Sequence, residues 1–344
     1  MNLTQVAQRF KKYLPLITIF GVAFFLIIFT IIARSRPKEE TLPVVPIPGY
    51  SASTQPASYD LSRLKPVEVP DELAIYKLTP QPLTRDFAFS LASKLNFEPQ
   101  PTQIIEETTT GTLYLWADSN RSLNVTEQSA IYDIALPAEG ESKTVNVAEA
   151  ERVAREFLSS INVDPSSLSV NGSYTKYFRI DEATIFPENN IQNADIVQLA
   201  FQASVEGNPL VGSNLDLGQA TVQVDENNNV VFFQFQKLQQ FVPQSKEKIK
   251  SFNDALMELN SRRATIIEAV AKTENGTEDI RVQPGFKIES ASITNAFLAY
   301  YYPTPAPEFI QPIYVFEGEF QSESKENGRL ILYLPALEGQ VISR

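Results

Sequence analysis

The chain of 344 residues contains no cysteine and no histidine. Without cysteine it forms no disulfide bonds, performs no thiol catalysis and builds no thiolate site for zinc or iron–sulfur clusters. Without histidine it lacks the commonest general base, the commonest zinc ligand and the central member of a Ser-His-Asp triad. Carboxylates are therefore the main remaining candidates for acid–base chemistry.

Basic residues are also scarce, with 29 Lys and Arg against 41 Asp and Glu, so the formal net charge is −12. Such a charge repels nucleic acid phosphates, and we expect no nucleic acid partner. Hydrophobic residues make up 43% of the chain, which is typical of a globular protein. The length is enough for one large or two ordinary domains.

One long apolar run, residues 14–33, carries no charge. As a helix it would span about 30 Å, the thickness of a bilayer's hydrocarbon core. We therefore predict a transmembrane helix at 14–34, after a cytoplasmic tail at 1–13 and before a proline-rich linker at 35–58. The run is too long for a signal peptide. The short basic tail favours a single-pass cell-membrane protein whose C-terminal part is extracytoplasmic.

After the linker, the residue patterns suggest three units, 59–145, 146–245 and 246–344, each a helix followed by strands. The predicted fold class is therefore α+β, with one N-terminal transmembrane helix and then helix-plus-antiparallel-meander units. A helix is expected at 85–95, with Thr84 as its N-cap, and two more begin after the N-caps Asn146 and Ser251. A further helical stretch is expected at 265–271. Strands are expected at 74–78, 103–109, 112–117, 122–125, 174–180, 196–205, 220–224, 230–235, 287–302, 313–320 and 329–334.

Several segments resemble the PepSY-like modules of YycI and YycH, membrane-anchored regulators of bacterial sensor kinases. The resemblance rests on the helix AEAERVAREFL at 148–158, on QLAFQASVEGNP at 198–209, and on segments 222–225, 229–231, 294–302 and 312–318. It implies PepSY-like α+β units that act through protein contacts. That family offers no catalytic residues to carry over.

Two kinds of motif call for a functional interpretation but fit turns better. S-x-x-K occurs at 245–248 and 322–325, without the partner motifs of penicillin-binding proteins, so solvated turns are expected. Residues 225–229, DENNN, match the start of a calcium loop. Val230 and Gln236 replace the glycine and glutamate that such a loop needs, so an Asn-rich hairpin turn is expected.

Paired carboxylates could serve a glycosidase. The pairs at 106–107, 149 and 151, and 317 and 319 all fall in patterns typical of exposed faces. We predict no catalytic, cofactor-binding or metal-binding residue. The single tryptophan, Trp116, is expected to anchor a core.

The one unusual candidate surface is Tyr300, Tyr301 and Tyr302, which precede a proline-rich loop. One interpretation makes these tyrosines the rim of a partner-binding surface, because exposed Tyr gives contact area at low entropic cost. The other interpretation, which the pattern favours, is a strand end with alternate tyrosines buried.

Together these patterns predict a non-enzymatic protein-interaction module of the bacterial envelope, held in the membrane by residues 14–33. Its expected partner is a membrane protein such as a sensor kinase, and no cofactor is expected. Two alternatives stay open: an envelope glycan hydrolase that uses paired carboxylates, and a purely structural spacer.

Overall fold

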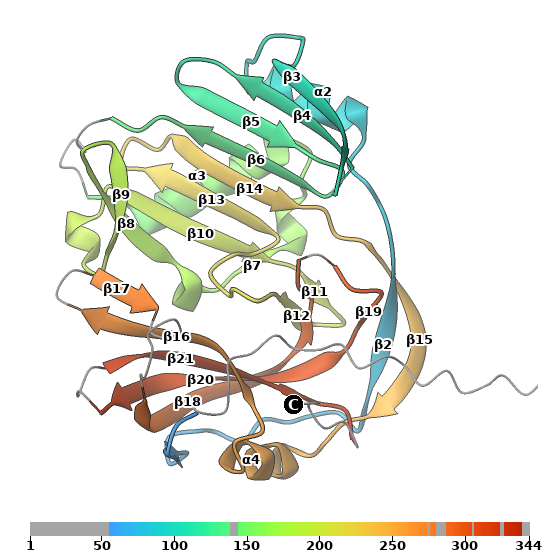
Figure 1. Ribbon diagram of the computed structural model, residues 1–344, viewed down its shortest axis with the longest axis vertical. Coiled ribbons are helices and arrows are strands. Elements are labelled where there is room, and N and C mark those ends of the chain that lie inside the picture. The colour runs from blue at the N-terminus through green and yellow to red at the C-terminus, as the bar shows by residue number, and fades with distance from the viewer. Residues whose placement is uncertain are drawn as a thin grey trace, which may run out of the picture. The chain divides into compact units, whose positions relative to one another are not determined.

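The computed structural model describes residues 55–109, 111–137, 144–273, 276–279, 287–304, 306–323 and 327–338. They belong to one compact unit that covers residues 45–344. Strands hold about half of them. The α-helices of this described part are α2 (Arg85–Lys94), α3 (Val147–Ser160) and α4 (Phe252–Asn260) (Figure 1).

A large antiparallel sheet, here called the glutamine sheet for reasons given below, combines strands from residues 103 to 236. Helices α2 and α3 pack on one of its faces, with Phe157 of α3 5.2 Å from Phe233 between ring centroids. Its order is β3 (Gln103–Thr108), β4 (Gly111–Ala117), β5 (Arg121–Val125), β6 (Ser129–Ile134), β14 (Val230–Gln236), β13 (Ala220–Asp225), β10 (Ile196–Gln202), β8 (Lys176–Asp181) and β9 (Thr184–Glu188), with β7 (Ser169–Val170) beside β10.

A second sheet, here called the C-terminal sheet, is built mainly from the last third of the chain. Its longest strand, β18, pairs in parallel with β1 and β12 and antiparallel with β20. The order is β11 (Ser204–Val205), β12 (Asn208–Val211), β18 (Ile288–Tyr301), β20 (Pro312–Ser322), β21 (Asn327–Pro335), β16 (Thr265–Thr273) and β17 (Gly276–Asp279), with β1 (Ser58–Asp60) beside β18.

A small third sheet joins three distant parts of the chain. It consists of β15 (Gln240–Lys248), β2 (Glu72–Thr79) and β19 (Phe309–Ile310) in that order, all antiparallel. In Figure 1, β2 and β15 run side by side as one long ribbon. Strand β2 contributes Tyr76, whose ring lies 5.4 Å from Tyr300 of β18, so this sheet packs against the C-terminal sheet.

The helix starts follow from their sequence. Thr84, Asn146 and Ser251 each accept a hydrogen bond from the backbone N–H three residues later, as predicted for N-caps. Trp116 is 1% exposed beneath Phe89 of α2, which confirms its predicted place in a core. The prediction of a helix at 265–271 is wrong.

That stretch forms β16 instead. Its residues are buried on both faces, apart from a partly exposed Val270, so the apolar run TIIEAVA carries no period that separates a strand from a helix. The β-branched residues Thr265, Ile266 and Ile267 favour the strand. Strands also occupy segments for which no strand was predicted, at 129–134, 184–188, 208–211 and 240–248.

The predicted fold class, α+β with PepSY-like helix-plus-meander units, is wrong. The described part is dominated by β-sheet, and its three α-helices hold 10, 14 and 9 residues. The sheets also combine strands from all three predicted units, since β3 to β6 join β14 in one sheet and β15, β2 and β19 form another. The sheets are therefore completed by pairing between strands that lie far apart in the sequence.

The prediction of a single-pass membrane protein also needs correction. No helix in the described ranges is long and apolar enough to cross a membrane. The longest, α3, has 14 residues and spans about 21 Å at 1.5 Å per residue, short of the bilayer core. Residues 14–33, where the sequence placed the span, lie outside the described residues. The predicted cell-membrane localisation and extracytoplasmic topology depend on that span, and no described helix supports them.

A network of charges connects the glutamine sheet to the C-terminal sheet. Asp216, in the connection from β12 to β13, is 6% exposed. It pairs with Lys176 of β8 and, at 3.1 Å, with Arg329 of β21. Arg329 also lies 3.5 Å from Glu268 and 5.1 Å over the ring of Tyr174. One arginine from the C-terminal sheet thus neutralises two buried carboxylates and covers an aromatic ring that precedes β8.

We predict that Arg329→Met destabilises the fold by about 3 kcal/mol, because it leaves Asp216 and Glu268 buried with less compensating charge. Urea denaturation measures the change. The matched control is Arg179→Met, since Arg179 is 53% exposed and lies 3.6 Å from Asp181. That control should stay within about 0.5 kcal/mol of the parent. Equal effects of the two substitutions would show that the network does not hold the sheets together.

Candidate functional site

The predicted rim of Tyr300, Tyr301 and Tyr302 is buried, with exposures of 0, 2 and 5%. Tyr300 and Tyr302 belong to one core, and Tyr301 belongs to the other, because the end of β18 is covered on both faces. The Tyr300 hydroxyl donates to the Ala74 carbonyl, and Tyr301 packs 5.9 Å from Tyr333. Buried rings offer no contact area to a partner, although Tyr302 lines the pocket described below.

The carboxylates singled out in the sequence are held by their neighbours. Glu317 accepts hydrogen bonds from the Tyr174 hydroxyl and, at 2.8 Å, from Asn295, while Glu319 on the same strand is exposed. Hydrogen bonds from Arg152 lower the pKa of Glu149.

The remaining carboxylates do not form a catalytic pair. Glu151 pairs with Arg155 at 2.8 Å, and Glu106 is exposed on β3; the Glu107 side chain lies outside the described residues. Within the described ranges no group of three or more acidic side chains is placed to hold a metal ion.

The turn motifs have structural roles. The Asp225 carboxylate accepts hydrogen bonds from the backbone of Asn227 and Asn229, and β13 and β14 pair on either side. This confirms the Asn-rich hairpin turn. Ser245 and Lys248 lie in strand β15, so the expectation of a solvated turn there is wrong. Ser322 ends β20, and residues 324–326 lie outside the described residues.

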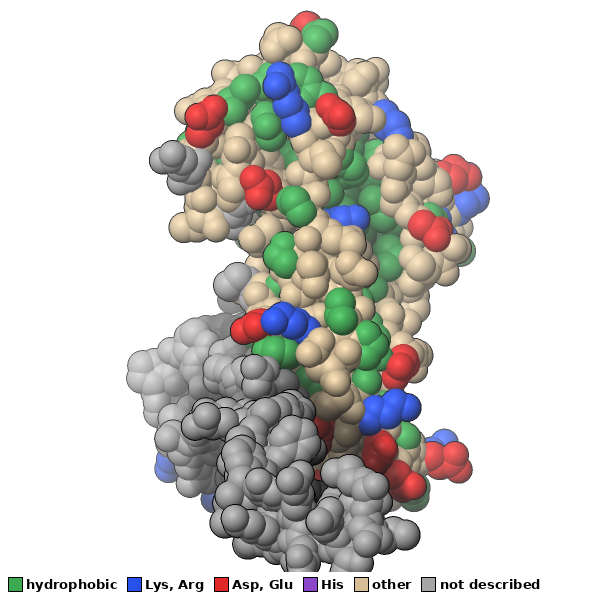
Figure 2. All heavy atoms as spheres, turned by 90° about the vertical axis from the view of Figure 1, so that its right-hand side faces the viewer, with side chains coloured by type: hydrophobic (Ala, Val, Ile, Leu, Met, Phe, Trp, Pro, Cys, Tyr) green, Lys and Arg blue, Asp and Glu red, His purple; other side chains and the backbone are tan. Residues whose placement is uncertain are grey.

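The surface shown in Figure 2 carries interspersed acidic and basic side chains, and hydrophobic side chains show between them in small groups. This face has no broad apolar patch of the kind that marks a large protein interface. The candidate binding features are a pocket and an exposed strand edge.

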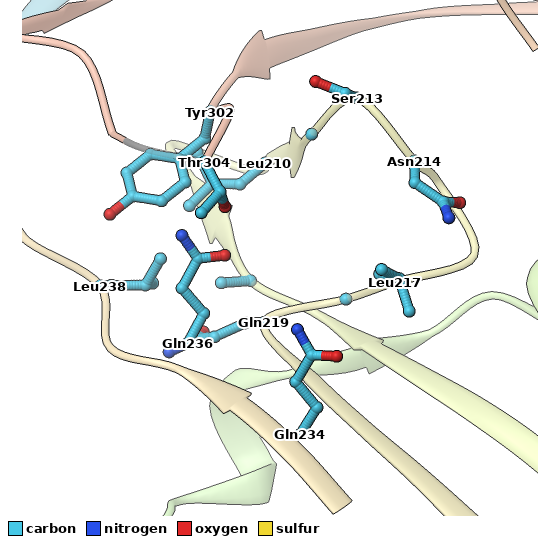
Figure 3. Close-up of a pocket in the computed structure, with 13 residues that line it drawn as sticks. Leu210, Ser213, Asn214, Leu217, Gln219, Gln234, Gln236, Leu238, Tyr302 and Thr304 are labelled. Carbon is cyan, nitrogen blue, oxygen red and sulfur yellow. The ribbon is translucent and has the colours of Figure 1, made fainter. Parts of the chain in front are cut away.

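A pocket of about 180 Å³ lies where the loop at 212–218 meets β14 and the chain that follows β18 (Figure 3). The side chains of Gln219, Gln234 and Gln236 line it. Alternation along β14 explains the last two: Phe233 and Phe235 face the helices, so Gln234 and Gln236 face the opposite side. The remaining lining residues are Ala203, Leu210, Gly212, Ser213, Asn214, Leu217, Gly218, Leu238, Tyr302 and Thr304.

Glutamines also line the neighbouring strands on the same sheet, which is why it is named for them. The Gln223 amide donates to the Gln198 side-chain oxygen at 2.8 Å, and Gln198 donates to the Asp216 carbonyl at 3.1 Å. Those two amides are therefore tied into the sheet. Gln219, by contrast, has a buried Oε1 with no hydrogen-bond partner among the described residues.

The edge strand β3 is the second unusual feature. Its isoleucines Ile104 and Ile105 are 47% and 38% exposed. Other edges are protected: β9 contains Pro187, β15 contains Pro243 and two lysines, and β11, β17 and β19 hold only two to four residues. Among the edges in the described part, β3 combines length with exposed apolar residues and lacks both proline and lysine.

Neither feature was predicted from the sequence, although both leave a signal in it. The repeat Phe-Gln-Phe-Gln at 233–236 places one kind of residue on each face of a strand. Adjacent isoleucines at 104–105 must face opposite sides of a strand, so both can be buried only when both faces are covered.

No protein-family model matches the chain, and no curated protein matches it. Among solved structures, it is similar to an uncharacterized protein from Eubacterium rectale, with 13% identity over 83% of this chain and 89% of that one. The TM-score is 0.48, and a likeness at that level carries no argument about fold or function.

The buried tyrosines predict how stability changes at high pH. Burial, with the charge of Asp254, raises the pKa of Tyr314 to about 12, and burial also raises the pKa of Tyr300. Because the unfolded chain releases these protons near pH 10, unfolding becomes more favourable above that pH. The free energy of unfolding should therefore fall steadily between about pH 10 and pH 12. Urea denaturation across this range measures it, and a flat profile would contradict the prediction.

Proposed function

We propose that this chain is a non-enzymatic protein-interaction module that acts by binding another protein along strand β3. The observation that carries the proposal is the exposed edge of the glutamine sheet at Gln103–Ile105, which lies before the register shift between Ile105 and Thr108 and contains neither proline nor lysine. An edge strand presents unpaired backbone N–H and C=O groups, which a second strand can pair with.

The side chains of β3 suit such an addition. Ile104 and Ile105 face opposite sides of the sheet, so an added strand would cover one apolar side chain on each face. Ile104 pairs with Tyr114 and Ile105 with Leu113 on the neighbouring strand β4. Each isoleucine therefore extends an apolar row that an incoming side chain can continue.

The proposed occupant is an extended segment of another protein in which β-branched residues alternate with lysine or arginine. Glu106 is exposed next to Ile105, and the chain has a net charge of −12, so a basic segment is attracted. A second copy of this chain would bring two acidic molecules together. Regulation of another protein by contact is also what the resemblance to YycI and YycH implies, and that resemblance is part of the proposal.

A display library of random peptides, selected against the full chain, tests this function. We expect enriched sequences to alternate β-branched and basic residues and to bind Ile105→Lys at least tenfold more weakly, a loss of about 1.4 kcal/mol. The matched control is Phe186→Lys, which makes the same charge change at the opposite edge of the same sheet, where Phe186 is 45% exposed. It should bind like the parent.

Backbone pairing has its own readout. Methylation of alternate peptide nitrogens should abolish binding, and the unmodified peptide should slow hydrogen exchange in β3. Selected peptides that bind Ile105→Lys as tightly as the parent would contradict the proposal. A reversible dimer that Ile105→Lys dissociates in sedimentation would assign the edge to a second copy instead.

A further inference from the structure

We propose that the pocket between the loop at 212–218 and β14 binds a neutral carbohydrate, one sugar ring at a time. This site is separate from strand β3 and does not depend on the function proposed there. The proposal rests on the hydrogen-bonding state, the charge and the size of the pocket.

The hydrogen-bonding state distinguishes the pocket glutamines from the rest of the sheet. Gln223 donates to Gln198, and Gln198 donates to the Asp216 carbonyl, whereas the side chains of Gln219, Gln234 and Gln236 make no hydrogen bond to any described residue. The Oε1 atom of Gln219 is buried without a partner. A buried acceptor without a partner costs about 1–3 kcal/mol. Solvent does not reach this atom, so a ligand would bind the other polar atoms of the three pocket amides, which can donate and accept hydrogen bonds.

Among the described residues, no charged side chain lines the pocket, although 20% of the chain is charged. An anionic ligand would find no Lys or Arg there, and a cationic ligand would find no Asp or Glu. Each glutamine amide offers both a donor and an acceptor, which matches hydroxyl groups because they also donate and accept. Leu217 and Leu238 supply apolar surface for the C–H faces of a ring.

The size of the pocket favours a compact group. Its volume of about 180 Å³ lies below the range of about 300–1,000 Å³ for drug-sized ligands, which excludes a nucleotide or another large cofactor. As Figure 3 shows, Ser213 and Asn214 lie on the loop at one side and Tyr302 and Thr304 at another. An extended peptide would need a long groove or a strand edge, so a cavity of this volume favours a sugar ring over a peptide backbone.

Ligand-observed NMR titration of the full chain with glucose, galactose and N-acetylglucosamine tests the proposal. At least one sugar should bind saturably, and Gln219→Leu should weaken the binding of that sugar by about tenfold. The melting temperature of Gln219→Leu should stay the same or rise, because the substitution removes a buried acceptor that has no partner.

The control is Gln223→Leu, which removes the hydrogen bond from Gln223 to Gln198. It should lower the melting temperature and leave sugar binding unchanged. This opposite pattern separates a ligand role from a structural one. Acetamide and glucuronate serve as amide and charged probes. Stronger binding of acetamide would reassign the pocket to a partner's amide side chain. No saturable binding of any sugar, or a Gln219→Leu variant that binds like the parent, would overturn the proposal.

Discussion

The two large sheets depend on the contacts that the guanidinium of Arg329 makes. It extends from the C-terminal sheet to Asp216, which is buried in the connection to the glutamine sheet, and it also faces Glu268. Two carboxylates at this depth are stable only because cations from both sheets neutralise them, Lys176 being the second. The apolar layer around Tyr301 and Tyr333 then packs beside this charge cluster.

Burial on both faces decides which sequence predictions held. Strands with one covered face, such as β14, alternate clearly and were predicted, as were helices with an N-cap of Thr, Asn or Ser. The stretch at 265–271 and the tyrosines at the end of β18 are covered on both sides. There the hydrophobic period disappears. A strand was therefore predicted as a helix, and three buried tyrosines were considered as a candidate binding rim.

The order of the strands could not be predicted for a different reason. Hairpins such as β4–β5 and β13–β14 are encoded locally by their turns. The contacts that join β6 to β14, and β2 to β15, link residues about a hundred or more positions apart. No local pattern specifies such pairings, because they follow from which faces remain uncovered once the hairpins have formed. An interpretation based on local units therefore found meanders such as β3 to β6, but it missed the pairings that join them to distant strands.

The glutamines show why the candidate site also escaped sequence analysis. Gln198, Gln223, Gln219 and Gln236 occupy similar positions on neighbouring strands, and by residue type they are equivalent. What separates them is whether the facing strand supplies a partner: Gln223 finds Gln198, whereas Gln219 faces the pocket. Satisfied amides stabilise the sheet, whereas the glutamines that line the pocket keep polar atoms that a ligand could bind. That distinction exists only in three dimensions, and it makes the pocket a place to look for a ligand.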